Sequence, residues 1–163
     1  MPERVLLVGG GGREHAIARA VSASEHSVTL VACAGTRNPG IAAAASRYAT
    51  LDTTDPAAVV SFAEETSATL AVVGPEAPLE AGVADALDEA GVYAFGPFAA
   101  DARIETDKAF QREFMAENDI TGCPEFAVFT DQQAAVEYLD EVSGDVAVKP
   151  RGLTGGKGVR VTG

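Results

Sequence analysis

Four consecutive glycines near the start of the chain constrain its fold more than any other feature. Gly9–Gly12 separate a short apolar run, Val5–Val8, from a segment with apolar residues at helical spacing. The apolar run has the length of a buried strand, so the pattern predicts a strand that enters a helix through a glycine turn. Backbone N–H groups and the positive end of the helix dipole meet at such a turn, which favours an anion such as a phosphate. Arg13, directly after the glycines, adds a forked cation suited to the same group.

The turn lacks the full dinucleotide-binding fingerprint. That fingerprint needs Gly-x-Gly-x-x-Gly, and here Glu14 or His15 stands where the third glycine belongs. The next apolar run, Val28–Ala32, is followed by Cys33 rather than by an acidic residue. The sequence therefore predicts phosphate binding and argues against NAD. The alternative is a tight turn that only packs the helix on the sheet.

Short apolar runs alternate with helical patterns over the first hundred residues. Further strands are expected at 70–73 and 92–95, a short helical piece at 41–45, and longer helices at 56–66 and 79–90. This alternation predicts an α/β fold, a Rossmann-like parallel sheet with helices on both faces. Such sheets bind ligands at the carboxyl ends of their strands. The loops Gly74–Leu79 and Gly96-Pro97 should therefore converge with the glycine turn on one crevice.

The pattern changes near residue 100, where we place a boundary between domains 1–100 and 101–163. Helices are expected at 99–104, 107–118 and 131–141, and strands at 125–129 and 145–149. A glycine-rich loop with Lys157 then joins 145–149 to a last strand. The loop is not a P-loop, because Arg151 occupies the first glycine position and Gly158 the position of the hydroxyl residue. Such a flexible hairpin with one cation suits covering a phosphate chain.

The acidic composition limits the possible partners. The net charge is −12, from 24 acidic and 12 basic residues, which is unfavourable for nucleic-acid binding. Only three of the basic residues are lysines. An acidic, lysine-poor composition indicates a protein that functions at high salt, where dissolved ions screen the repulsion between its acidic side chains. The apolar runs are too short to span a membrane. The two cysteines match no metal spacing, so we expect free thiols and a cytoplasmic protein.

Five motifs together resemble a known enzyme family. They are Val8–Ala16 (VGGGGREHA), Val73–Leu79 (VGPEAPL), Phe95–Pro97 (FGP), Asp107–Phe110 (DKAF) and Val148–Val159 (VKPRGLTGGKGV). In this order they resemble phosphoribosylamine–glycine ligase, also called glycinamide ribonucleotide synthetase, in its archaeal form, within the ATP-grasp superfamily. The resemblance covers essentially the whole chain. Gly10 and Arg151 depart from the polar and acidic residues that many members carry there.

The resemblance implies an ATP-dependent ligation in purine biosynthesis. ATP phosphorylates glycine, and the amine of 5-phosphoribosylamine displaces the phosphate to give glycinamide ribonucleotide. The implied substrate-binding residues are Gly10, Gly11, Gly12, Arg13, Glu14, His15, Gly74, Pro75 and Glu76. The implied ATP-binding residues are Lys108, Lys149, Gly155, Gly156, Lys157 and Gly158. Glu76 would accept hydrogen bonds from ribose hydroxyls; alternatively, its carboxylate only braces the proline-rich turn. No catalytic residue is assigned.

Family enzymes are much longer than this chain. We therefore expect this chain to be the N-terminal part of a longer enzyme, in which the rest of the ATP-grasp domain follows. Alone, the chain should not catalyse the reaction. The nucleotide would be ATP with Mg²⁺ or Mn²⁺, whose ligands are expected outside these residues. The partners are small molecules, with no nucleic acid and no membrane. Two other functions remain open: a non-catalytic module that binds a phosphosugar or nucleotide, and another ATP-grasp enzyme of purine synthesis.

Overall fold

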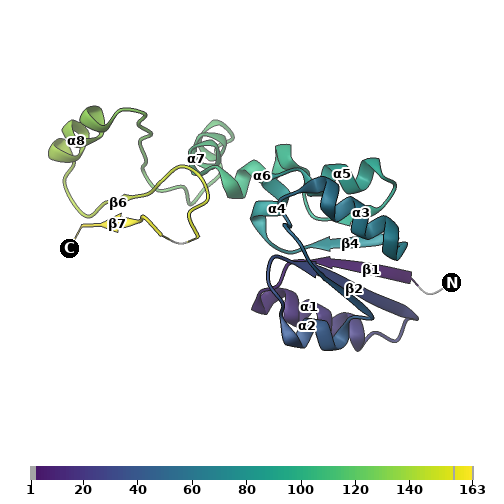
Figure 1. Cartoon of the computed structure of the whole chain (residues 1–163). Coiled ribbons are helices and arrows are strands. Elements are labelled where there is room, and N and C mark those ends of the chain that lie inside the picture. Colours follow the sequence, from purple (N-terminus) through teal and green to yellow (C-terminus); the bar gives the residue numbers. More distant parts are fainter. Residues whose placement is uncertain (1–2, 156, 163) are drawn as a thin grey trace. The chain divides into compact units, whose positions relative to one another are not determined.

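The computed structural model describes residues 3–155 and 157–162, which form two compact units, residues 1–102 and 103–163 (Figure 1). The first unit is built on five strands: β1 (Glu3–Val8), β2 (Val28–Ala34), β3 (Arg47–Thr50), β4 (Leu70–Val73) and β5 (Tyr93–Phe95). Their order is β3-β2-β1-β4-β5, and every pairing is parallel. The predicted α/β class with a parallel sheet is confirmed.

Helices cover both faces of this sheet, as predicted (Figure 1). One face carries α1 (Gly12–Ser22) and α2 (Pro39–Ala44), and the other carries α3 (Pro56–Thr66) and α5 (Val83–Glu89). The strand residues divide by alternation: Leu7 packs toward α1 and α2, whereas Leu6 and Val8 pack toward α3 and α5. Because both faces are buried, the strands read as continuous apolar runs.

The helix ends follow from local chemistry. Asp55 caps α3, since its carboxylate accepts hydrogen bonds from the backbone N–H groups of Ala57 (3.0 Å) and Ala58 (3.3 Å). The single helix expected at 79–90 is wrong. The chain forms α4 (Glu76–Glu80) and then α5, because Gly82 between them has a φ of +82°, a left-handed conformation that breaks the helix.

Strand β3 was not predicted. Its sequence, Arg47–Thr50, contains no apolar run, and its residues are exposed or half-buried. It lies at the edge of the sheet and pairs only with β2. An edge strand needs fewer apolar residues, so its sequence carries a weak strand pattern.

The chain reverses direction across the sheet between β1 and β4. From β1 the chain first moves outward through β2 to β3, and then crosses back to β4 on the other side of β1. Val8 is in register with Cys33 of β2 and Val73 of β4, so these three strands end at one level. In open parallel sheets this switch point is where ligands bind. The glycine turn and the Gly74–Leu79 loop both leave the sheet here.

The second unit contains less regular structure. Its elements are the second half of α6 (Ala99–Thr106), α7 (Lys108–Glu117), α8 (Gln132–Glu141), β6 (Ala147–Val148) and β7 (Arg160–Val161). β6 and β7 pair antiparallel, so the expected hairpin forms with shorter strands. The strand expected at 125–129 is wrong, because this segment pairs with no other strand within the described residues. An apolar alternation becomes a strand only when a neighbour accepts its hydrogen bonds.

Many apolar side chains of the second unit are exposed. They are Ile104, Ile120, Phe126, Val128, Phe129, Val136, Tyr138, Leu139, Val148, Leu153, Val159 and Val161. Its only buried apolar residue among those described is Ala109. Among the helices of the described residues, none has the length and apolar character needed to cross a bilayer.

Candidate substrate and nucleotide sites

The carboxylate of Glu14 lies inside the glycine turn of the first unit. Glu14 sits in the first turn of α1 and is only 3% exposed. Its Oε2 accepts a hydrogen bond from the backbone N–H of Gly11 at 2.7 Å. One of the N–H groups that the sequence offers to an anion is thus bound by the protein's own carboxylate. The negative charge at a helix N-terminus is also favoured by the helix dipole.

Three glycines make room for this carboxylate. A Cβ on Gly9 would lie 2.8 Å from Glu14 Cγ, and one on Gly11 would lie 2.7 Å from Glu14 Oε2. A Cβ on Gly74, from the loop after β4, would overlap Glu14 as well. Gly9 also has a φ of +124°, which disfavours any side chain. The glycines of two separate loops are therefore explained by close packing around one buried side chain.

Arg13 connects Glu14 to the loop after β4. Its Nε donates a hydrogen bond to Glu14 Oε1 at 3.0 Å, and its Nη2 lies 3.6 Å from Glu76 Oε1. The hydrogen bond to Glu14 is the main cause of the raised pKa of Arg13. The Arg13 and Glu76 side chains remain 57% and 41% exposed, so both can reach a ligand. Arg13, Glu14 and Glu76, predicted from separate motifs, are brought together.

Asn38 and Tyr48 were not predicted: Asn38 holds the turn from the other side, and the Tyr48 hydroxyl accepts a hydrogen bond from the Asn38 backbone N–H at 3.2 Å. Asn38 Nδ2 donates a hydrogen bond to the carbonyl of Gly10 at 2.9 Å, and Asn38 Oδ1 caps α2. The Tyr48 hydroxyl donates to the carbonyl of Thr36 at 2.8 Å. Asparagine followed by proline is typical of a helix start, but nothing in the sequence indicates a contact between Asn38 and Gly10.

One side of the turn is open. A Cβ on Gly12, or on Gly35 in the loop after β2, would meet nothing within 4 Å. His15 has a different environment, because its ring lies against Gly40 at the start of α2. His15 therefore contributes to packing α1 on α2. Gly12 and Gly35, together with the exposed side chains of Arg13 and Glu76, form a polar surface at the switch point of the sheet.

In the second unit, the start of α7 is tied to the start of the glycine-rich loop. The Lys108 ammonium donates a hydrogen bond to the carbonyl of Gly152 at 2.8 Å, and the Lys108 backbone N–H donates to the carbonyl of Arg151 at 3.0 Å. Asp107 caps α7 and forms two hydrogen bonds with the Arg151 guanidinium. Lys108 is thereby placed beside the loop.

The other predicted nucleotide residues lie along the hairpin. Lys149 directly follows β6 and is exposed, as is Lys157 in the loop. Gly155 and Gly158 have φ angles of +57° and +80°, left-handed conformations that suit a tight turn. Gly156 lies outside the described residues. The Lys157 backbone N–H donates to the carbonyl of Thr154 at 3.0 Å, which folds the loop back on itself.

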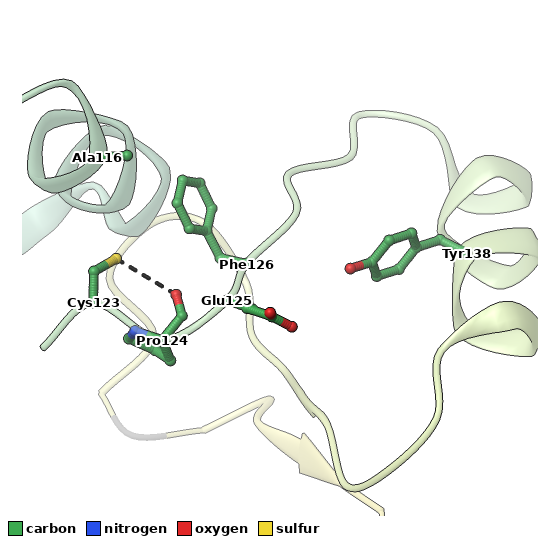
Figure 2. Close-up of a pocket in the computed structure, with 6 residues that line it drawn as sticks. All are labelled: Ala116, Cys123, Pro124, Glu125, Phe126 and Tyr138. Carbon is green, nitrogen blue, oxygen red and sulfur yellow. Dashed lines mark hydrogen bonds between the residues drawn. The ribbon is translucent and has the colours of Figure 1, made fainter.

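An open hollow of about 480 Å³ lies elsewhere in the second unit (Figure 2). Its lining residues are Ala116, Cys123, Pro124, Glu125, Phe126 and Tyr138. Figure 2 shows Tyr138 on α8 facing the segment that carries Glu125 and Phe126, with Cys123 donating a hydrogen bond to the carbonyl of Pro124 at 3.5 Å. These residues bear no group that the predicted chemistry requires.

Metal ligands are not gathered in the described part of the chain. Residues 3–155 and 157–162 contain no cluster of three histidine, cysteine or acidic side chains placed to hold an ion. Cys33 is fully buried, and burial raises its pKa to about 12. Such a thiol is neither a ready ligand nor a nucleophile at neutral pH. The residues present do not fit a metal centre of their own.

Two profiles of one protein family match the chain in succession. The profile described as phosphoribosylglycinamide synthetase, N domain, matches residues 3–105. The profile described as phosphoribosylglycinamide synthetase, ATP-grasp (A) domain, matches residues 106–163. The two matches meet within α6, close to the limit between the two compact units.

Several curated relatives share one name. Phosphoribosylamine–glycine ligase from Methanococcoides burtonii is 51% identical over 159 residues, 98% of this chain and 37% of that protein. The ligase from Methanopyrus kandleri is 53% identical over 161 residues, 98% of this chain and 36% of that protein. The ligase from Pyrococcus furiosus is 50% identical over 160 residues. The chain thus spans little more than a third of the length of these relatives.

Solved structures confirm the fold. The biotin carboxylase domain of Hydrogenobacter thermophilus 2-oxoglutarate carboxylase matches 99% of this chain, and 37% of that one, with a TM-score of 0.75 at 22% identity. N5-carboxyaminoimidazole ribonucleotide synthetase from Thermotoga maritima matches 98% of this chain, and 40% of that one, with a TM-score of 0.73 at 16% identity. The family profiles and the relatives show that the chain belongs to the phosphoribosylglycinamide synthetase family and corresponds to its N-terminal part.

Proposed function

We propose that this chain is the N-terminal part of an ATP-dependent ligase that joins glycine to 5-phosphoribosylamine. ATP transfers its γ-phosphoryl group to the glycine carboxylate, which gives glycyl phosphate and ADP. The amine of phosphoribosylamine attacks the acyl carbon, and inorganic phosphate leaves as glycinamide ribonucleotide forms. The observation that carries the proposal is the relatives' identity of about 50%, which extends over both family profiles.

The first unit is proposed to bind the phosphoribosylamine substrate. The proposed bounds of this substrate-binding domain are residues 1–100. The surface formed by Gly10–His15 and Gly74–Glu76 lies at the switch point, where open parallel sheets bind ligands. Arg13 would contact the phosphate, and Glu76 would accept hydrogen bonds from ribose hydroxyls. Glu14 is buried and hydrogen-bonded to Gly11, so it would act by shaping the turn.

Residues 101–163 are proposed as the start of the nucleotide-binding domain. Lys108, Lys149 and Lys157, with the loop glycines Gly155, Gly156 and Gly158, would bind the ATP phosphates. Phosphoryl transfer depends mainly on positioning and charge neutralisation, and three lysines around a glycine loop supply both. These are the only lysines of the chain.

The rest of the ATP-grasp domain is proposed as the partner of the second unit. This unit exposes aromatic and aliphatic side chains on α8, on the 120–129 segment and on the β6–β7 hairpin. An apolar surface of this kind is normally buried against protein. In the relatives, nearly two thirds of the chain lies beyond the matched region.

The nucleotide is proposed to bind as a complex with Mg²⁺ or Mn²⁺. The 2-oxoglutarate carboxylase domain of similar fold was solved with MgADP. The described residues do not gather a metal site, so the ligands would come from the remainder of the enzyme.

An isotope experiment tests the proposed reaction. The complete ligase that contains this chain is incubated with ATP, phosphoribosylamine and ¹³C-glycine, and the products are identified by mass spectrometry. We expect labelled glycinamide ribonucleotide and one ADP for each product molecule. Omission of glycine is the matched control and should stop ADP formation.

Other outcomes would overturn the proposal. ADP formation that needs bicarbonate or formate in place of glycine would assign the chain to another ATP-grasp reaction. Saturable binding of ribose 5-phosphate with no product under any condition would instead indicate a non-catalytic binding module.

A further inference from the structure

We propose that the ion pair between Asp107 and Arg151 positions the glycine-rich loop and Lys108 for the nucleotide, without touching the nucleotide itself. This inference rests on the proposed function, because it concerns how the ATP-binding residues are arranged. Neither residue belongs to the predicted site.

Asp107 has two roles at the start of α7. Its Oδ1 accepts hydrogen bonds from the backbone N–H groups of Ala109 and Phe110, both at 3.1 Å, and thereby caps the helix. The same carboxylate accepts from Arg151 Nε at 2.9 Å and from Arg151 Nη2 at 2.8 Å. Oδ1 thus serves both the cap and Arg151 Nε, whereas Oδ2, which the cap does not use, accepts only from Arg151 among these donors.

The geometry of the Arg151 contact is specific. Two guanidinium nitrogens each donate to a different carboxylate oxygen, Nε to Oδ1 and Nη2 to Oδ2, which fixes the direction of the side chain as well as its distance. The hydrogen bond from Arg151 holds the pKa of Asp107 at about 2, so the pair stays charged at any pH used for an assay. Arg103 Nη2 approaches the same carboxylate at 3.9 Å, and its guanidinium lies over the Phe110 ring.

The ion pair belongs to a set of contacts that join the loop to α7. The Lys108 backbone N–H donates to the carbonyl of Arg151 at 3.0 Å, and the Lys108 ammonium donates to the carbonyl of Gly152 at 2.8 Å. Side chain and backbone of Arg151 are therefore both held by the first turn of the helix. Beyond Gly152 the loop is rich in glycine and has a flexible chain. The contacts of Arg151 and Gly152 with α7 therefore determine the position of the loop.

The arrangement makes a positioning role specific to Asp107 and Arg151. The guanidinium of Arg151 is directed at Asp107, which neutralises its charge, although the Arg151 side chain is 59% exposed. Loss of the ion pair would keep all three lysines. The glycine-rich loop would, however, be held less firmly beside Lys108. The expected consequence is weaker ATP binding, with little effect on the other substrates.

Two substitutions separate the ion pair from the helix cap. Asp107→Asn keeps a good capping side chain but removes the charge that holds Arg151. Arg151→Met keeps a long side chain and removes the guanidinium. Arg47→Met is the matched control, because it breaks another exposed arginine–carboxylate pair, with Glu65 at 2.7 Å, in the first unit.

Steady-state kinetics of the complete ligase provide the readout. For Asp107→Asn and Arg151→Met we expect KM for ATP to rise about two- to fivefold, the range expected for one exposed ion pair. KM for glycine and phosphoribosylamine should change little, and Arg47→Met should match the wild type. The double variant should be no worse than either single variant, because both remove the same interaction.

A second measurement follows the contact itself. The Lys108 amide is bonded to Arg151, so its hydrogen exchange should accelerate in both single variants and stay unchanged in Arg47→Met. Raised salt should narrow the difference in KM between wild type and variants, because it screens the pair in the wild type only.

The outcomes distinguish the inference from the proposed function. An active wild type with an unchanged KM for ATP in both variants would overturn the positioning role and leave the ligase function standing. An equal rise in KM for all three substrates would also overturn it, since that result describes general destabilisation. A folded wild-type enzyme that makes no labelled product would overturn the proposed function, and the inference with it.

Discussion

At the residue scale, the buried carboxylate of Glu14 organises the turn that the sequence presents as an anion site. The glycines at positions 9, 11 and 74 are packed around it, and Gly11 donates a hydrogen bond to it. A glycine-rich turn in a sequence shows that something must approach the backbone closely. It does not show whether that group is a ligand or another part of the protein.

Replacement of Glu14 should therefore destabilise the fold. We expect Glu14→Gln to lower the free energy of unfolding by about 1.5–3 kcal/mol, the usual contribution of a hydrogen bond to a charged group. Glu76→Gln is the matched control, because Glu76 faces the same arginine but is exposed, and should cost less than about 1 kcal/mol. Urea denaturation measures both, and equal losses would contradict the buried role of Glu14.

The two cysteines should differ in reactivity. Burial raises the pKa of Cys33 to about 12, so its reactive thiolate is scarce at pH 8, whereas Cys123 is half-exposed. Alkylation of the native protein, followed by mass spectrometry, should label Cys123 first and Cys33 only after unfolding. Equal labelling rates would show that Cys33 is accessible.

The same burial gives Cys33 a defined effect on stability. Its pKa in the folded state lies above the unfolded value of about 8.5. The unfolded chain therefore loses the thiol proton first, and the free energy of unfolding should fall as the pH rises from about 8.5 toward 12. Cys33→Ala should flatten this part of the pH profile.

At the element scale, the buried strands and the caps were predictable because their causes are local. β4 and α3 have the predicted bounds, 70–73 and 56–66, and the cap residue Asp55 directly precedes α3 in sequence. The edge strand β3 was missed, and the 125–129 strand was wrong, because strand formation there depends on partners distant in sequence. The same limit applies to the site: Arg13 and Glu76 came from motifs, whereas Asn38 and the Asp107–Arg151 pair became visible only in three dimensions.

The break between α4 and α5 depends on the backbone of one glycine. Gly82 has a φ of +82°, which costs a residue with a side chain roughly 1–2 kcal/mol. Thermal denaturation should therefore show Gly82→Ala to be less stable than wild type by about that amount. Gly35→Ala is the matched control, since it meets no neighbour within 4 Å and has no positive φ, and should have little effect.

At the scale of the whole molecule, charge dominates the expected behaviour. A net charge of −12 on 163 residues produces repulsion that dissolved ions screen. We expect the midpoint of thermal unfolding to rise with potassium chloride, by about 2–4 °C for each kcal/mol gained. Maximal stability at low ionic strength would contradict the expectation of a protein suited to high salt.

The central claim is that this chain serves as the N-terminal part of a glycine-joining ligase. A chimera tests it most directly, with residues 1–163 followed by the remaining part of the Methanosarcina barkeri relative, which is 51% identical over the matched region. The measurement is growth without purines of a strain that lacks phosphoribosylamine–glycine ligase. The account predicts growth with the chimera and none with either part alone. A chimera that is folded and binds ATP, yet supports no growth and incorporates no glycine, would contradict it.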